Sequence, residues 1–218
     1  PDYLMPSCSN IIHQKLKLNE DCATFDINLG CSGYVYGLYV IMNLVSNCEG
    51  NSHGLLLVGD TISKTVDKKD KSNLLLFGDA VSATLIEKKE NFKNFFLVGS
   101  GSTGFDKLIL KNSGFRSEYK KFLMKPEFFM DGKEVFSFAI NKVPKLIKEI
   151  IKKSKIKNID FYILHQANKM MLNKILDMSK INMNKRLFSI KNYGNTSSSS
   201  IPITICKNLY NNKNKKLS

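Results

Sequence analysis

Short apolar runs alternate with helical stretches along the chain, a pattern typical of α/β proteins. The polar stretch Thr61–Asn73 predicts a surface excursion between two of these runs. The predicted strands are Ala23–Asn28, Leu55–Val58, Leu74–Phe77, Ala83–Glu87, Phe95–Val98, Leu108–Leu110 and Asp160–Leu164.

Three stretches have helical patterns. Cys31–Cys48 is almost wholly apolar, so we expect a helix that is buried all round. Asp131–Lys153 carries one apolar stripe at i, i+3, i+4 spacing, and Pro144 within it predicts a kink or a break. Asn168–Met178 is the helix predicted after the strand that leads into His165. A division near residue 92 is expected, with two similar αβ halves at 1–92 and 93–218.

Length and composition restrict the class of protein. A chain of 218 residues that is 43% hydrophobic can bury a core as one large domain or two small ones. The longest apolar stretch, Tyr34–Val45, is too short to span a bilayer, which needs about 20 residues. Five cysteines are an odd and sparse set for this length, which argues against a disulfide-stapled secreted domain.

The net charge of +14 comes almost entirely from lysine, because Arg116 and Arg186 are the only arginines. Proteins that bind nucleic acid rely on the planar fork of arginine, so a nucleic-acid binder is a weak candidate. The lysines fit either a general bias toward solvated basic faces or a surface that attracts an acidic partner.

Cys31 is the first candidate for chemistry. It follows a predicted strand and Gly30 and opens a helix, where the helix dipole and free N–H groups favour a thiolate. The same N–H groups could stabilise an oxyanion. The competing interpretation is a small core residue, which is how we interpret Cys8, Cys22, Cys48 and Cys206.

His165 and Asn195 are the other two candidates. His165 ends an apolar strand, where open α/β sheets bind ligands, whereas His13 and His53 are interpreted as structural. Asn195 lies in a polar loop, where asparagine often only forms a turn. The sequence contains no CxxC or HExxH pattern, so it predicts no metal site. The glycine-rich segment 99–104 is not followed by the Lys-Ser/Thr pair of a phosphate-binding loop.

Four segments together resemble the 3-oxoacyl-acyl-carrier-protein synthase III family. Residues 26–34 (DINLGCSGY) resemble its nucleophile motif, and 77–83 (FGDAVSA) its glycine-rich FGDGAGA segment. Residues 165–168 (HQAN) match its histidine motif and 194–197 (GNTS) its asparagine motif. The segments occur in the family's order, and the histidine motif differs from that of related thiolases.

The resemblance implies a thiolase-like fold of two pseudo-symmetric halves with a layered αβαβα core, and catalytic Cys31, His165 and Asn195. Cys31 would be acylated by an acyl-CoA primer, while His165 and Asn195 would hold the thioester carbonyl of malonyl-acyl-carrier protein during decarboxylation. The implied partners are an acidic acyl carrier protein, acyl-CoA and a second copy in a homodimer. The resemblance implies no cofactor, metal, nucleic acid or membrane span, and it implies a cytoplasmic location.

The chain also departs from the family. Family members extend further at both ends, so we expect a fold truncated at both ends and only marginally stable alone. Ala80, Val81 and Ser82 replace a run of smaller residues, and their bulk is expected to disturb close packing. The alternative function is a non-catalytic scaffold of the same fold that binds an acyl carrier protein.

Overall fold

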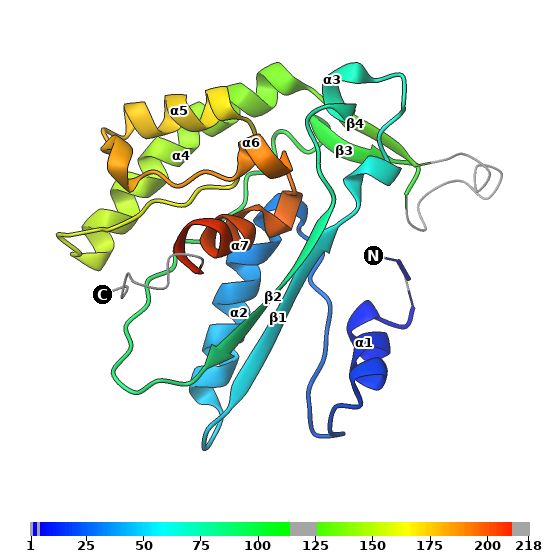
Figure 1. Cartoon of the computed structure of the whole chain (residues 1–218), viewed down its shortest axis with the longest axis vertical. Coiled ribbons are helices and arrows are strands. Elements are labelled where there is room, and N and C mark those ends of the chain that lie inside the picture. The colour runs from blue at the N-terminus through cyan, green and yellow to red at the C-terminus, as the bar shows by residue number, and fades with distance from the viewer. Residues whose placement is uncertain (1, 4, 114–125, 211–218) are drawn as a thin grey trace.

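The computed structural model describes residues 2–3, 5–113 and 126–210. A long β-hairpin crosses the centre of the molecule, with α2 behind it and α7 beside it (Figure 1). Helices α4, α5 and α6 lie together on one side, and α1 lies on the other. The elements are α1 Cys8–Leu16, α2 Gly33–Asn47, β1 His53–Asp60, α3 Lys71–Leu74, β2 Ala80–Glu87, β3 Leu108–Lys111, β4 Glu127–Met130, α4 Gly132–Ser154, α5 Lys169–Met178, α6 Ile190–Tyr193 and α7 Ser200–Ile205.

The central hairpin pairs β1 with β2 in antiparallel register, from His53 opposite Glu87 to Asp60 opposite Ala80. Helix α2 packs so closely on one face that a side chain at Gly54 would come within 2.5 Å of Ile41. The opposite face is apolar and exposed, with Leu55, Leu57, Val81 and Leu85. Strands β3 and β4 form a second antiparallel pair.

The side chains of Ala80, Val81 and Ser82, which were expected to disturb close packing, fit into strand β2 without a clash. Val81 lies on the exposed face of the hairpin, opposite Gly59, which offers no side chain to collide with it. A side chain at Gly59 would come within 2.1 Å of a Val81 methyl group, so Val81 fits because its cross-strand neighbour is a glycine. Ser82 points the other way, and its buried hydroxyl has no hydrogen-bond partner among the described residues.

The orphaned hydroxyl of Ser82 leads to a prediction about stability. Ser82→Ala is expected to raise the free energy of unfolding by about 1 kcal/mol, because a buried unpaired hydroxyl is costly. Urea denaturation measures the change. Ser199→Ala is the matched control and should destabilise, since the Ser199 hydroxyl donates to the carbonyls of Val58 (2.9 Å) and Ala80 (3.2 Å). A loss of stability in Ser82→Ala would contradict the prediction.

The second half is organised by two capped helices. The side chain of Asp131 accepts from the N–H groups of the first turn of α4, and Asn168 caps α5 in the same way. Helix α5 contributes the best-buried apolar side chains, Leu172, Ile175 and Leu176. Helix α4 continues through Pro144 without a break.

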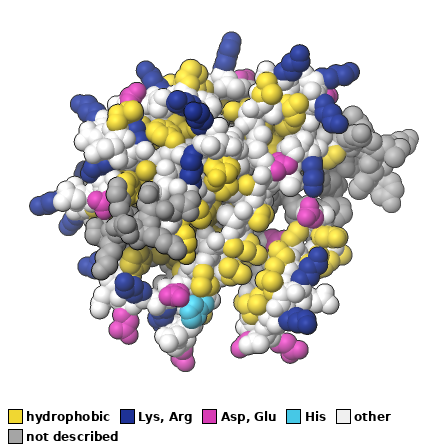
Figure 2. Space-filling model, in the orientation of Figure 1, with side chains coloured by type: hydrophobic (Ala, Val, Ile, Leu, Met, Phe, Trp, Pro, Cys, Tyr) yellow, Lys and Arg dark blue, Asp and Glu magenta, His cyan; other side chains and the backbone are white. Residues whose placement is uncertain are grey.

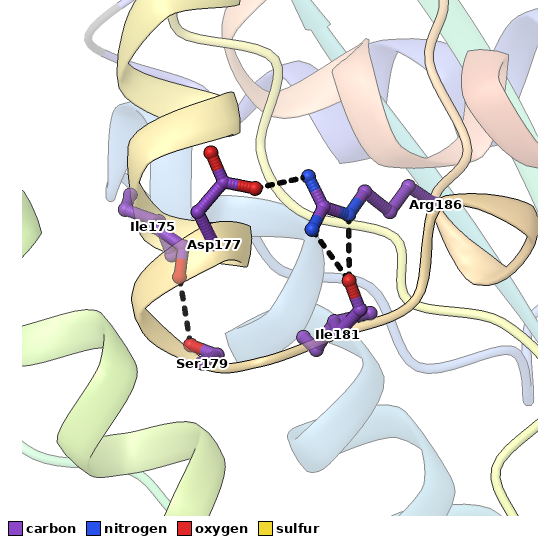
Figure 3. Close-up of polar contacts among 5 residues, drawn as sticks. All are labelled: Ile175, Asp177, Ser179, Ile181 and Arg186. Carbon is purple, nitrogen blue, oxygen red and sulfur yellow. Dashed lines mark hydrogen bonds and ion pairs between the residues drawn. The ribbon is translucent and has the colours of Figure 1, made fainter.

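The turn that follows α5 is fixed by the buried side chain of Arg186 (Figure 3). Its guanidinium pairs with Asp177 (Nη1 to Oδ1, 2.6 Å), and its Nε donates to the Ile181 carbonyl (2.9 Å). Ser179 donates to the Ile175 carbonyl at the end of the same helix (2.8 Å). Arg186 therefore has a structural role and is not part of a basic surface.

Several predicted elements were wrong. Ala23–Asn28 and Phe95–Val98 are irregular, and Asp160–Leu164 has only a bridge from Tyr162 to Arg186. A strand needs a neighbouring strand to pair with, and none of the described strands pairs with these runs. At Leu74–Phe77 the chain instead ends α3 and forms a bridge from Phe77 to Asn195.

Two helices also differ from expectation. Helix α2 is not buried all round, because Val35, Tyr39 and Leu44 on it are exposed. Helix α1 was not predicted at all. The carboxylate of Asp26 accepts from the N–H groups of Cys8 (2.7 Å) and Ser9 (2.9 Å) at its first turn. The division at residue 92 stays a prediction.

The chain leaves a large surface uncovered. Its accessible area is 16513 Å², against about 10,000 Å² expected for a folded monomer of this mass. Figure 2 shows hydrophobic side chains gathered across the middle of one face, over β1 and β2, with lysines around the margin.

Among the described helices, none combines the length and apolar character required to cross a bilayer.

Candidate active site

Cys31 lies in a 3-10 turn, Gly30–Ser32, that leads directly into α2. Gly30 has a φ of +51°, a left-handed conformation that glycine adopts at no steric cost. The turn places the thiol against the loop that precedes α7, where Cys31 Sγ lies 3.5 Å from the hydroxyl of Ser197. The predicted nucleophile therefore meets a segment that is 166 residues away in sequence.

Asn195 lies in that loop and is 5% exposed. Its backbone is fixed by the segment after α3, because its N–H donates to Leu76 (2.9 Å) and its carbonyl accepts from Gly78 (3.0 Å). Its side-chain Oδ1 accepts from the N–H of Ser197 (3.0 Å). Within the described part of the chain no hydrogen bond holds its Nδ2, so the amide NH₂ is left as a donor.

The four serines after Thr196 connect the two halves of the chain. Ser197 contacts Cys31, and the hydroxyl of Ser198 donates to Asp60 at the end of β1 (2.6 Å). Ser199 donates to carbonyls of β1 and β2, and Ser200 contacts His165. Sequence reasoning missed these serines and Asp60. The run of four serines next to Asn195 was the available signal.

His165 is brought to the same loop by its own motif. Gln166 is fully buried, and its side-chain carbonyl accepts from Ser189 (3.0 Å), which ties the motif to the start of α6. Asn168 caps α5 by accepting from Met171 (2.7 Å). The ring of His165 lies with its Nδ1 2.7 Å from the Ser200 hydroxyl. Cys31, His165 and Asn195 thus all lie against residues 197–200.

The expectation that the helix N-terminus would favour a thiolate was wrong. Burial raises the pKa of the Cys31 thiol, and the negative charge of Asp60 raises it further. The hydrogen bond from Ser197 and the N–H of Cys31 itself act in the opposite direction but are outweighed. The fold therefore disfavours the Cys31 thiolate relative to that of an exposed cysteine.

Burial lowers the pKa of His165 to about 4, and contact with the backbone of Ser197 offsets this only in part. In the unfolded chain His165 has a pKa near 6.5, so it binds a proton at a higher pH than it does in the folded chain. The contribution of neutral His165 to the free energy of unfolding should therefore be fully present above about pH 6.5. It should decline by at most about 3 kcal/mol as the pH falls to about 4.

This decline can be measured by urea denaturation between pH 7 and pH 4. His165→Gln keeps a polar side chain without a titrating ring, so it should lose this part of the pH dependence while the carboxylates still titrate. Equal pH dependence in the two proteins would contradict the prediction.

Gly78 lets the segment after α3 approach the Asn195 loop. A side chain there would come within 2.2 Å of the Tyr193 carbonyl oxygen. Gly78→Ala is therefore expected to cost about 1–3 kcal/mol in stability and to displace Asn195. Thermal melting measures the cost. Gly99→Ala, at a position with open space, is the control; equal stability of the two variants would contradict the prediction.

The described residues also bear on the expectations for metal binding and for the remaining cysteines. They contain no group of three or more His, Cys, Asp or Glu side chains that could hold a metal ion. Cys22, Cys48 and Cys206 are exposed free thiols, so the expectation that they are core residues was wrong. They lie at a turn, at the end of α2 and in the last helical turn, where the chain faces solvent.

Taken together, the site is that of an α/β protein in which a half-buried thiol, an imidazole and an amide each contact the serine segment 197–200. The family profile of 3-oxoacyl-[acyl-carrier-protein (ACP)] synthase III matches residues 25–104, and the profile of its C-terminal part matches residues 152–217. The chain belongs to this family.

Individual proteins of this family are also similar to the chain in sequence. The chain is 33% identical to the beta-ketoacyl-[acyl-carrier-protein] synthase III 2 of Halalkalibacterium halodurans and 34% identical to the synthase III of Coxiella burnetii, with 94% of the chain aligned in each case. It covers 62% and 63% of those proteins, less than two thirds of their length.

A solved structure of a 3-oxoacyl-(acyl-carrier protein) synthase from Burkholderia xenovorans LB400 superposes with a TM-score of 0.89 at 35% identity. The match covers 100% of this chain and 65% of that one. The chain therefore has the α/β, thiolase-like fold predicted from its sequence.

Proposed function

We propose that the protein carrying this chain is a 3-oxoacyl-acyl-carrier-protein synthase III, which condenses an acyl-CoA primer with malonyl-acyl-carrier protein. The observation that carries the proposal is the meeting of Cys31, His165 and Asn195 at residues 197–200. Membership of the family and the names of its relatives support it.

In the first half-reaction Cys31 acts as the nucleophile. Its sulfur attacks the thioester carbonyl of the primer, the carbon–sulfur bond to CoA breaks, and the proton of the thiol ends on the CoA sulfur. Burial raises the pKa of Cys31, so this proton is harder to remove than the proton of an exposed cysteine. The product is an acyl-Cys31 thioester.

In the second half-reaction His165 and Asn195 act as hydrogen-bond donors. Loss of carbon dioxide from the malonyl group places negative charge on its thioester oxygen, where fixed donors stabilise it most. The free NH₂ of Asn195 and the imidazole N–H of His165 are such donors. The resulting carbanion attacks the acyl carbon of acyl-Cys31, the bond from that carbon to the Cys31 sulfur breaks, and the 3-oxoacyl product forms. The thiolate that leaves takes a proton from solvent and regenerates the thiol. Both steps use substrates and side chains alone, so we propose no cofactor.

We propose an acidic acyl carrier protein and a second copy of the chain as partners. The exposed lysines support the first, because they favour an acidic surface. The apolar face of Leu55, Leu57, Val81 and Leu85 supports the second, because an exposed patch of this kind is typical of an interface. A cytoplasmic location, where acyl-CoA would be at hand, is part of the same proposal.

The test is intact-protein mass spectrometry after the complete protein is mixed with a short acyl-CoA. We expect one acyl adduct, located on Cys31 by peptide mapping. Cys22→Ala is the control, since it removes an exposed thiol and should leave the adduct unchanged. No adduct, with carrier-protein binding retained, would overturn the proposal in favour of a non-catalytic scaffold.

A further inference from the structure

Ser200 is a buried residue at the first position of α7, and it contacts His165 directly. Its hydroxyl oxygen lies 2.7 Å from Nδ1 of the imidazole. The same oxygen accepts from the backbone N–H of Gln166 at 3.3 Å. Ser200 is 1% exposed, so water does not compete for these hydrogen bonds.

The position of the hydroxyl proton follows from these two contacts. A hydroxyl has one proton to donate, and the contact from Gln166 uses a lone pair of the oxygen. Among the described residues, Nδ1 of His165 is the one acceptor that this hydroxyl contacts. If Nδ1 carried the ring proton, the hydroxyl proton would be buried without a partner, at a cost of about 1–3 kcal/mol.

We propose that Ser200 is a positioning residue, which donates to Nδ1 of His165 and so fixes the neutral tautomer with its proton on Nε2. This inference rests on the proposed function, because Nε2–H is then the donor offered to the malonyl thioester. Ser200 acts through the ring of His165 and touches no reacting atom. The lowered pKa of His165 supports the neutral ring that the hydrogen bond requires.

The direct test is nuclear magnetic resonance of the complete protein labelled with ¹⁵N-histidine, at pH 7 and without substrate. The long-range proton–nitrogen couplings show which ring nitrogen of His165 is protonated. We expect protonated Nε2 and bare Nδ1, with a mixture of both tautomers in Ser200→Ala. A proton on Nδ1 in the unmodified protein, or an unchanged tautomer in Ser200→Ala, would overturn the inference.

A kinetic test separates positioning from packing. Ser200→Ala should lower malonyl decarboxylation about tenfold while acyl loading of Cys31 is preserved, and Ser200→Thr should restore most of the rate because it keeps the hydroxyl. Ser199→Ala removes a neighbouring buried hydroxyl that contacts only backbone carbonyls, so it should leave the tautomer unchanged. Equal decarboxylation by Ser200→Ala and the unmodified protein would overturn the inference.

The two proposals fail in different ways. Acylated Cys31 together with an Nδ1–H imidazole would refute the role of Ser200 and leave the proposed function standing. Absence of acylation together with Nε2–H would refute the function and retain the tautomer assignment.

Discussion

Replacing Asn195 by aspartate should lower malonyl decarboxylation by about 10²–10³-fold, the cost of removing one donor from an oxyanion-stabilising site. Aspartate keeps the oxygen that accepts from the Ser197 N–H, so the loop should hold its shape. It replaces the NH₂ donor by a second acceptor and adds a negative charge. The substitution therefore tests the donor with little change in shape.

The measurement is carbon dioxide release from malonyl-acyl-carrier protein, with circular dichroism to show that the fold is kept. Asn192→Asp is the matched control, because it makes the same chemical change in the same segment at an exposed side chain that accepts from Lys207 (2.6 Å). We expect its rate to stay within twofold of the unmodified protein. Near-normal decarboxylation by Asn195→Asp would show that the amide does not donate to the reacting oxygen.

The helices of the second half could be predicted from sequence because their signals are local. Asp131 and Asn168 cap α4 and α5 through hydrogen bonds within three residues, and the apolar stripe of α4 repeats within one helix. The predicted strand Ala23–Asn28, by contrast, is irregular in the structure. A run of alternating or apolar residues shows that a segment can be extended, but a strand also needs a partner, which the run does not specify.

Some features of the site could likewise be predicted from sequence and others could not. The family resemblance singled out Cys31, His165 and Asn195, and the structure brings each of them to the serine run. Apart from Asn195 itself, the side-chain partners of those serines outside the loop lie 34 to 166 residues away, so no local pattern could assign them. The pKa of Cys31 was misjudged for a related reason, because the helix N-terminus is visible in the sequence whereas burial and the charge of Asp60 arise only in the folded chain.

Cys31→Ala should abolish acyl loading completely and leave malonyl decarboxylation partly intact. The sulfur forms the bond to the primer, so without it no acyl-enzyme can accumulate. In the proposed mechanism decarboxylation depends instead on His165 and Asn195, which are anchored by Ser200 and by Leu76 and not by the thiol. Condensation should be lost with the acyl-enzyme.

Intact-protein mass and carbon dioxide release measure the two steps on the same sample. Cys31→Ser is the matched control, since its hydroxyl can keep the contact with Ser197 but is a far weaker nucleophile than the thiol. Acyl loading should be lost in both variants, and decarboxylation should be retained at least as well in Cys31→Ser. Equal loss of both steps in both variants would mean that the sulfur takes part in decarboxylation, and the division of labour between the thiol and the two donors would be wrong.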